Sequence, residues 1–340
     1  MRRREFIVGT FATSAMGFAQ PICAQTNGSA LVTKRIAIVH PTEKPEGLTV
    51  NGRQGYRVFF GELNKRGFVE GHNLVVERFS ALGRSDGYEN VARAAVESQP
   101  DLIICFGTPL ALRLKSLTAT IPIVTTTADP IAAGLVTSLA RPDRNITGVS
   151  VDAGIELWGK RFQLLREVTR GRLANVRFLF TNTAILWEST AASVREAAQR
   201  TGASISAALL GSSVDQAAYE RVFDGMDSER VDGLIVYDAA EHLTNRELIV
   251  DLAAKHRLPA IYPFREFVEV GGLLSYGVDT AELTRRLADM TDRVLRGAKP
   301  EDIPLYQLAK FDLTLNRKTA ASLGLEFPAS LLAVADEVIE

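Results

Sequence analysis

Two stretches of the sequence repeat one pattern, and this repeat decides the fold. The first stretch runs Asp101-Leu-Ile-Ile-Cys-Phe-Gly107 and is followed, after a helix-like segment, by Ile121-Pro-Ile-Val-Thr125. The second runs Asp232-Gly-Leu-Ile-Val-Tyr-Asp238 and is followed in the same way by Leu258-Pro-Ala-Ile-Tyr262. In each copy an Asp precedes a short apolar strand, and a Pro stands at the start of the next strand. Two similar α/β halves in one chain usually enclose a cleft, and clefts between lobes commonly bind small molecules.

Short apolar segments alternate with amphipathic segments along both halves. Strands are expected at residues 35–40, 74–79, 101–106, 121–126, 146–151, 176–180, 204–210, 234–237, 260–262 and 272–275. Helices are expected at residues 52–66, 86–99, 109–117, 131–139, 190–200, 216–226, 245–256 and 280–297. This alternation predicts βαβ crossovers and mainly parallel sheets that are covered on both faces. The fold class is therefore α/β, with two Rossmann-like lobes joined by crossover strands.

The order of these segments also divides the chain. Residues 34–148, with part of 277–340, are expected to form a first lobe, and residues 149–276 a second lobe. The tail from Leu305 onward holds a strand-like segment, Phe311-Asp-Leu-Thr-Leu315, and a final helix. No Gly/Ser-rich or Pro-rich linker separates the halves, so we expect several segments to cross between the lobes.

The N-terminal residues 1–24 have the pattern of an export signal. Arg2-Arg3-Arg4 gives a positive start, a short apolar stretch spans residues 6–19, and Ala24 is the expected cleavage position. The run Arg3-Arg4-Glu5-Phe6-Ile7 resembles a twin-arginine signal, so the Sec and Tat routes both stay open. Two alternatives are a free amphipathic N-terminus and a lipid anchor on Cys23. An exported, periplasmic protein is the main expectation.

Composition excludes several classes of protein. The net charge is −1, which gives no electrostatic reason to expect a nucleic-acid partner. No later segment has eighteen consecutive apolar residues, as a membrane-spanning helix requires. The four histidines and two cysteines show no metal-ligand spacing, and the phosphate-binding and nucleophile motifs of common enzymes are missing. We therefore expect no metal, no cofactor and no enzymatic activity.

Polar and aromatic residues that directly follow strands are the candidate binding residues. In open α/β sheets a ligand lies at the carboxyl ends of the strands. These positions hold Thr42, Thr108, Asp129, Asn182, Trp187, Asp238, Phe264 and Tyr276.

Each candidate also has a structural interpretation. Thr108 is expected to cap the helix that follows it, and Asp129 could cap the segment at 131–139. Trp187 is expected in a loop, where it could act as a lid or a stacking surface. Trp158 and its neighbours at helical spacing, Phe162 and Leu165, are expected in the core.

Longer phrases of the chain resemble a known family. They are Asp129-Pro-Ile-Ala-Ala-Gly-Leu-Val136, Leu139-Ala-Arg-Pro142, Asn145-Ile-Thr-Gly148, Leu258-Pro-Ala-Ile-Tyr-Pro-Phe-Arg-Glu-Phe267, Gly271-Gly-Leu-Leu-Ser-Tyr-Gly277, Gly297-Ala-Lys-Pro300 and Ala335-Asp-Glu-Val-Ile339. With these phrases the whole chain after the export signal resembles the ABC-transporter substrate-binding proteins that include tryptophan-binding and other aromatic-amino-acid-binding members. One departure is the charged segment 42–50, with Glu43, Lys44 and Glu46, where many relatives have small residues.

The resemblance implies a type I periplasmic-binding fold with a cleft that closes on a solute. It implies capture of a small molecule outside the membrane and its delivery to an ABC permease. We expect the protein to be a monomer. If the solute is an amino acid, the backbone at Thr108 would bind its carboxylate, and Asp238 or Asp129 would bind its ammonium group. Phe264 or one of the other aromatic candidates, Tyr276 and Trp187, would contact its side chain.

Two other functions remain open at this stage. An α/β enzyme acting on a small carboxylated substrate could use Asp129, Asp238 and Glu266 as acid–base groups. A transcription regulator with the same lobes would need an N-terminal DNA-binding segment, and residues 1–34 have an export pattern instead.

Overall fold

The computed structural model describes residues 33–151, 154–181 and 184–340, and the side chains of 184–190 are outside its description. The expected export signal falls on residues 1–24, which lie outside the described residues.

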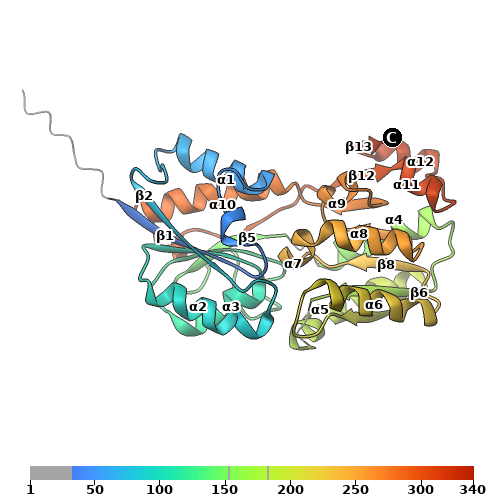
Figure 1. Cartoon of the computed structure of the whole chain (residues 1–340), viewed down its shortest axis with the longest axis horizontal. Helices are drawn as coiled ribbons and strands as arrows, with labels where there is room; N and C mark the ends of the chain where they lie inside the picture. Colours follow the sequence, from blue (N-terminus) through green and yellow to red (C-terminus); the bar gives the residue numbers. More distant parts are fainter. Residues whose placement is uncertain (1–32, 152–153, 182–183) are drawn as a thin grey trace, which may run out of the picture. The chain divides into compact units, whose positions relative to one another are not determined.

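A six-stranded sheet forms the first lobe, which we call the N-lobe. Its strand order is β11-β5-β4-β3-β1-β2, and the paired strands all run parallel. The strands are β1 (Lys34–His40), β2 (Leu74–Ser80), β3 (Leu102–Phe106), β4 (Ile123–Thr127), β5 (Ile146–Ser150) and β11 (Tyr306–Gln307). Helices α2 (Tyr88–Glu97) and α3 (Thr108–Leu117) cover one face, and α1 (Gln54–Lys65) and α10 (Thr280–Leu295) cover the other, as Figure 1 shows.

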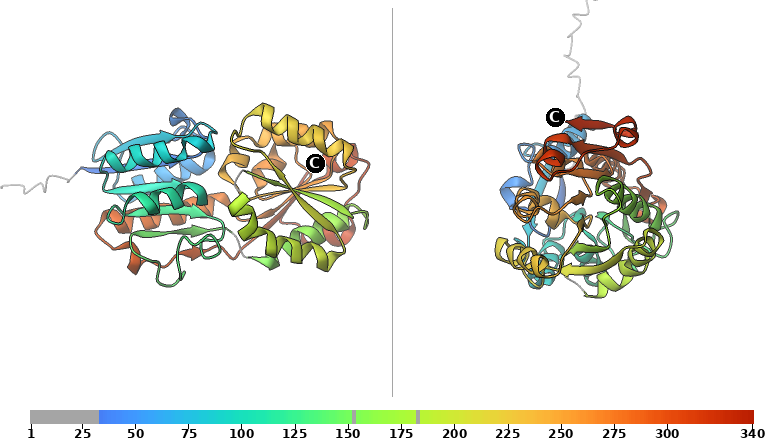
Figure 2. Two further views of the ribbon diagram at one scale, coloured as in Figure 1. Left: turned by 90° about the horizontal axis from the view of Figure 1, so that it is seen from below. Right: turned by 90° about the vertical axis from the view of Figure 1, so that its right-hand side faces the viewer.

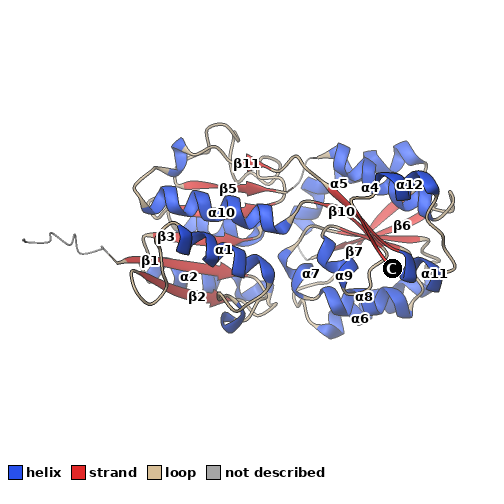
Figure 3. Ribbon diagram, turned by 90° about the horizontal axis from the view of Figure 1, so that it is seen from above, coloured by secondary structure: helices blue, strands red, loops and turns tan. Residues whose placement is uncertain are grey.

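A seven-stranded sheet forms the second lobe, the C-lobe. Its order is β13-β12-β10-β9-β8-β6-β7, and all pairs are parallel except β10 with β12. The strands are β6 (Asn175–Phe180), β7 (Ser204–Leu209), β8 (Gly233–Val236), β9 (Ala260–Tyr262), β10 (Leu274–Gly277), β12 (Asp312–Asn316) and β13 (Glu337–Ile339). The helices are α4 (Ile155–Val168), α5 (Ala184–Thr201), α6 (Gln216–Ser228), α7 (Ala240–Thr244), α8 (Arg246–Lys255), α9 (Arg265–Glu269), α11 (Arg317–Ser322) and α12 (Ala329–Val334). Figure 3 shows the strands of both sheets between their helices.

The chain passes between the two sheets more than once. It leaves the N-lobe sheet after β5, returns between β10 and α10, and crosses again between β11 and β12. Figure 2 allows these passages to be followed by colour. The predicted α/β class with two mainly parallel sheets is confirmed. The expected lobe limits, 34–148 with part of 277–340 and 149–276, stay a prediction.

The repeated Asp has the same structural role in both lobes. Asp101 Oδ2 accepts a hydrogen bond from the backbone N–H of Arg35 at 2.7 Å. Asp232 Oδ2 accepts from the N–H groups of Ala174 and Asn175 at 3.0 and 2.8 Å. Each carboxylate therefore binds the start of the neighbouring strand, β1 or β6, and satisfies backbone groups that the sheet leaves unpaired.

The repeated Pro has a matching role through its carbonyl. Pro122 O accepts from Ile103 N, and Pro259 O accepts from Leu234 N, both at 2.9 Å. A proline lacks an N–H but keeps its acceptor, so it suits the first position of a strand. The sequence repeat is thus a repeat of strand pairing.

Helix α4 carries the core side chains that its spacing predicts. Trp158, Phe162 and Leu165 are fully buried against the C-lobe sheet. Trp158 packs edge-on against Phe178 with ring centroids 5.2 Å apart. These side chains belong to the core of the C-lobe, as their spacing predicts.

The helix expected at 131–139 is wrong. This segment forms one turn and then an irregular loop. Asp129 Oδ1 accepts from the N–H groups of Ile131 and Ala132, and Leu135 N then bonds Pro130 O. Gly134 follows with a φ of +68°, a left-handed conformation that ends helical turns.

Two further expectations need correction. Trp187 lies within α5 and not in a loop, because this helix begins six residues earlier than expected, at Ala184. The final helix of the tail is instead two short helices, α11 and α12, followed by strand β13. Helix α11 ends at Ser322, shortly before Gly324 with a φ of +70°, and Pro328 directly precedes α12.

Candidate functional site

A cavity of about 370 Å³ is lined by residues from both lobes. This volume falls within the range of about 300–1,000 Å³ that small-molecule sites have. The N-lobe contributes the ends of β1, β3 and β4 and the starts of α1 and α3. The C-lobe contributes the segment after β8 and the segment between β9 and α9. These are carboxyl ends of parallel strands, where open α/β sheets bind their ligands.

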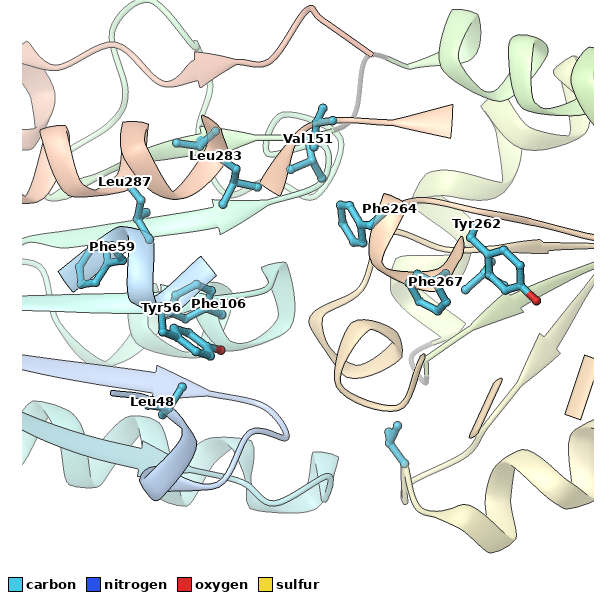
Figure 4. Close-up of a cluster of buried hydrophobic side chains, with 14 of the residues drawn as sticks. Leu48, Tyr56, Phe59, Phe106, Val151, Tyr262, Phe264, Phe267, Leu283 and Leu287 are labelled. Carbon is cyan, nitrogen blue, oxygen red and sulfur yellow. The ribbon is translucent and has the colours of Figure 1, made fainter. Parts of the chain in front are cut away.

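Aromatic rings form a large part of the lining. Tyr56 and Phe106 meet edge to face with centroids 5.8 Å apart, and His40 lies 5.3 Å from Phe106. Phe264 belongs to the C-lobe, and Figure 4 shows it on the side turned toward Tyr56 and Phe106. The cavity therefore offers flat apolar surfaces from both lobes, as binding of a large apolar group requires.

His40 is a neutral ring in this site. Burial lowers its pKa well below the usual range, and the nearby Arg53 cation lowers it further. Its Nδ1 accepts hydrogen bonds from the backbone N–H groups of Thr42 and Glu43 at 3.1 and 2.8 Å. The imidazole thus fixes the turn after β1 and leaves its other nitrogen as the protonated one.

Two helices begin at the cavity without a side-chain cap. Helix α1 follows Arg53, and α3 follows Gly107, and neither of these N-cap residues makes a side-chain capping bond. Their first N–H groups and helix dipoles favour a negatively charged group nearby. Both helix starts, including Gln54 and Thr108, line the same cavity.

Thr108 does not cap its own helix, contrary to expectation. Gly107 occupies the N-cap position with a φ of +94°, which places Thr108 in the first turn. The Thr108 hydroxyl lies 2.8 Å from that of Thr127 and accepts from Ala128 N at 3.2 Å. Thr108 therefore joins α3 to the end of β4.

The C-lobe side of the cavity carries a buried ion pair. Arg161 Nη1 donates to Asp238 Oδ1 at 2.7 Å, and the two side chains are only 1% and 2% exposed. Burial raises the pKa of Asp238, and the Arg161 guanidinium opposes this rise. Arg161 Nε also donates to the backbone oxygen of Tyr276 at 2.9 Å.

A second buried acid, Glu241, joins the lobes. Tyr88 of α2 donates to Glu241 Oε1 at 2.6 Å. Burial raises the pKa of Glu241, while this hydrogen bond lowers it. A third acid that lines the cavity, Glu266, accepts from the Thr280 hydroxyl, and burial raises its pKa as well.

Three of the candidate residues from the sequence line the cavity together: Thr108, Asp238 and Phe264. Three others lie away from its described lining. Thr42 donates to Thr244 of the other lobe at 2.9 Å, and Asp129 holds the turn after β4. Tyr276 stacks on Phe311 with centroids 5.7 Å apart.

The last two candidates lie where the structure describes no side chains. Asn182 lies outside the described residues, and Trp187 lies in α5 where side chains are not described.

Several lining residues were not found from the sequence. Arg53 pairs with Glu43 at 2.7 Å and lies over the Tyr56 ring at 5.4 Å, so the charged segment after β1 reaches the site. Glu241 could not be predicted as a lining residue, because it lies in the short helix α7, which has no distinctive motif. Arg161, which lies behind the lining, could have been noticed in the sequence, because it stands on the apolar stripe of α4 between Trp158 and Leu165.

Comparison with known proteins shows the family to which this chain belongs. The family model of ABC transporter substrate binding proteins matches residues 36–339. The chain belongs to that family. Among curated proteins this substrate-binding protein is 24% identical over 271 residues to the tyrosine-binding protein of Clostridioides difficile strain R20291, covering 79% of this chain and 76% of that protein.

Solved structures share the fold of this substrate-binding protein. A conserved domain protein from Vibrio cholerae superposes with a TM-score of 0.78 at 24% identity, covering 90% of this chain and 99% of the other. An ABC domain from Streptococcus pneumonia in complex with L-Trp superposes with a TM-score of 0.77 at 23% identity, covering 90% and 100%. The predicted type I periplasmic-binding fold is confirmed.

Family membership confirms the predicted class of function. Substrate-binding proteins of ABC transporters capture a small molecule outside the cytoplasm and present it to a permease, and catalysis is not their role. Among the residues that the structure describes, none of the helices is both long and apolar enough to cross a bilayer.

Proposed function

We propose that this substrate-binding protein captures an amino acid with a large, aromatic side chain in its interlobe cavity and delivers it to an ABC permease. The observation that carries this proposal is the distribution of charge in one cavity. Uncapped helix starts at Gln54 and Thr108 lie on the N-lobe, and the carboxylates of Asp238 and Glu241 lie on the C-lobe. A zwitterion needs these two kinds of group on opposite sides.

The cavity offers a place for each part of such a solute. The carboxylate would bind the N–H groups at the start of α3, beside the Thr108 and Thr127 hydroxyls. The ammonium group would bind Asp238, and the side chain would lie between Phe106 and Phe264. The names of two similar proteins, one tyrosine-binding and one solved with L-Trp, agree with this class of solute.

The test is a thermal-shift and calorimetric screen of L-amino acids against protein that has been unfolded and refolded to remove any solute acquired during expression. Binding to the native state adds about 2.7 kcal/mol at about 100 times the Kd. We expect L-tryptophan, L-tyrosine or L-phenylalanine to raise the melting temperature, and their amides to fail because the carboxylate is lost. No stabilisation by any of the aromatic amino acids would reject the proposal.

The protein is further proposed to be exported as a monomer with its signal removed near Ala24. Intact-mass measurement of protein from the periplasmic fraction gives the mature N-terminus. Light scattering after size exclusion gives the oligomeric state. A mature chain that keeps residues 1–24 would contradict the proposed processing, and a stable dimer would contradict the monomer.

A further inference from the structure

A charged residue occupies the buried stripe of α4. Arg161 follows Trp158 by one helical turn and directly precedes Phe162, and all three side chains are almost fully buried. The Arg161 guanidinium also lies over the Trp158 ring at 4.9 Å. A buried arginine loses its hydration and needs a partner that compensates for this loss. The neighbouring core positions of α4, Trp158 and Phe162, are apolar.

Arg161 binds two segments of the C-lobe, and one of them lines the cavity. One contact is the carboxylate of Asp238, directly after β8, and the other is the carbonyl of Tyr276, near the end of β10. Gly277 follows Tyr276, and a Cβ at this glycine would lie 3.4 Å from Arg161 Nη2. Two hydrogen bonds and the Trp158 ring thus hold the guanidinium in one orientation. Arg161 lies behind Asp238, which itself lines the cavity.

The ion pair with Arg161 favours the ionised form of the Asp238 carboxyl group. A carboxyl group with 2% exposure and no cation beside it would take up a proton near neutral pH. A protonated Asp238 could no longer form a charged hydrogen bond with an ammonium group. Other ionisable groups line the cavity: His40, Arg53, Tyr56 and Arg57 from the N-lobe, and Glu241, Arg246, Glu266 and Glu269 from the C-lobe. The Tyr276 side chain lies outside the described lining, although its backbone oxygen accepts from Arg161. Arg161 is the group in direct contact with Asp238.

We infer that Arg161 is a positioning residue for solute selection: it holds Asp238 ionised and oriented so that the cleft prefers solutes carrying an ammonium group. This inference rests on the proposed function, because it assigns Asp238 to the ammonium group of an amino acid. It adds Arg161 as the residue that keeps Asp238 able to bind an ammonium group. It also predicts how the preference for ammonium-bearing solutes depends on pH.

The experiment compares two probes that differ only in the ammonium group, L-tryptophan and 3-(indol-3-yl)propanoate. Their Kd values are measured by calorimetry at about pH 6 and about pH 8 for the wild type, Arg161→Met and Arg161→Lys. Arg200→Met is the matched control, because Arg200 forms an exposed pair with Glu196 on α5. Arg161→Lys keeps the cation and loses the planar fork of donors.

The wild type is expected to prefer L-tryptophan by about tenfold or more at both pH values. Arg161→Met should lower this preference to about threefold or less near pH 6 and regain part of it near pH 8, with little change for the propanoate. Arg161→Lys should retain most of the preference, and Arg200→Met should match the wild type. A preference in Arg161→Met that is unchanged at both pH values would overturn the inference. An equal loss of affinity for both probes would also overturn it, because that is the effect of a purely structural residue.

A measurement without ligand separates this inference from the proposed function. Carbon NMR of the Asp238 carboxyl group, assigned by its loss in Asp238→Asn, follows its protonation in the wild type and in Arg161→Met. The midpoint should move to clearly higher pH in Arg161→Met. If the wild type binds neither probe, the proposed function fails, and an unchanged midpoint would reject the role of Arg161 as well. If Arg161→Met does not fold, Arg161→Lys and the charge-free double variant Arg161→Met/Asp238→Asn replace it. The double variant should bind both probes about equally, and a tryptophan preference of about tenfold in it would contradict the role assigned to the pair.

Discussion

Asp238 and Glu241 lie three residues apart after β8, and burial raises the pKa of both acids. Their partners give them different roles. Arg161 behind the cavity holds Asp238, whereas Tyr88 from the N-lobe donates to Glu241. Asp238, which lines the cavity, therefore pairs within its own lobe, whereas Glu241 joins the two lobes.

Phe264 gives the first prediction, because this aromatic residue of the C-lobe lines the cavity on the side turned toward Tyr56 and Phe106. Phe264→Leu should weaken binding of L-tryptophan by about two- to tenfold, since stacking of aromatic rings is worth about 0.5–1.5 kcal/mol. Calorimetry measures the affinity. Phe267→Leu is the control, because Phe267 is fully buried, stacks on Tyr262 and is not among the described lining residues. An equal loss of affinity in both variants would show that packing alone is involved.

Glu241 gives a prediction about pH. Because burial raises its pKa in the folded state, the folded protein binds its proton more tightly than the unfolded chain does. Stability from Glu241 is thus greatest at low pH and is lost as pH rises through the folded pKa. Glu241→Gln should therefore gain stability relative to the wild type on going from about pH 5 to about pH 8. Urea unfolding measures this difference, and Glu247→Gln, at a side chain 72% exposed, should show no such trend.

At the scale of elements, strands that end close together build the site. The ends of β3 and β4 are joined through Thr108 and Thr127, and the ends of β8 and β10 are joined through Arg161. Backbone segments must therefore approach closely at these ends. Glycines are found where a side chain would block this approach.

Gly277 at the end of β10 shows this requirement most clearly. A Cβ there would lie 1.6 Å from the carbonyl oxygen of Pro263. Gly277→Ala should lower the free energy of unfolding by at least about 1–3 kcal/mol, as overpacking does. Gly61→Ala is the matched control, because this helical glycine of α1 has nothing within 4 Å and should gain about 0.5–1 kcal/mol. Similar unfolding midpoints in urea for the two variants would contradict the close approach.

At the scale of the whole molecule, backbone segments of the two lobes bond directly to each other. Val214 N donates to Gly83 O at 2.8 Å, and Ser85 N donates to Ser212 O at 3.1 Å. Arg84 and Ser213 form an isolated antiparallel bridge between these bonds. These bonds join the two lobes directly, and we expect them to favour a closed arrangement of the lobes.

Gly83→Val tests this contact between the lobes. Gly83 has a φ of +83°, and a Cβ there would lie 3.0 Å from Val214 O. The variant should open the ligand-free protein, seen as a larger radius of gyration in solution scattering, and should weaken solute binding by about three- to tenfold. Gly67→Val is the control, because Gly67 has a φ of +91° and nothing within 4 Å. It carries the same backbone strain, and an equal opening in this variant would reject the contact.

Much of the fold could be predicted because local patterns determine it. The repeated Asp and Pro positions, the apolar strands and the stripe of α4 each follow from neighbouring residues in sequence. The prediction of a helix at 131–139 was wrong, because Asp129 and Gly134 favour a single turn there despite the apolar pattern of the segment. Family phrases then predicted the class of function that the comparisons confirm.

Local sequence patterns were enough to predict an α/β fold with mainly parallel sheets and a solute-binding family. Which residues meet in the cavity follows instead from the packing of distant segments. Thr42 and Tyr276 follow strands as Asp238 does, yet contacts with Thr244 and Phe311 place them elsewhere. Arg161 and Glu241 acquire their roles from partners 77 and 153 residues away in the chain, namely Asp238 and Tyr88. Local patterns cannot encode such pairings, because burial and charge compensation arise only when distant segments pack together.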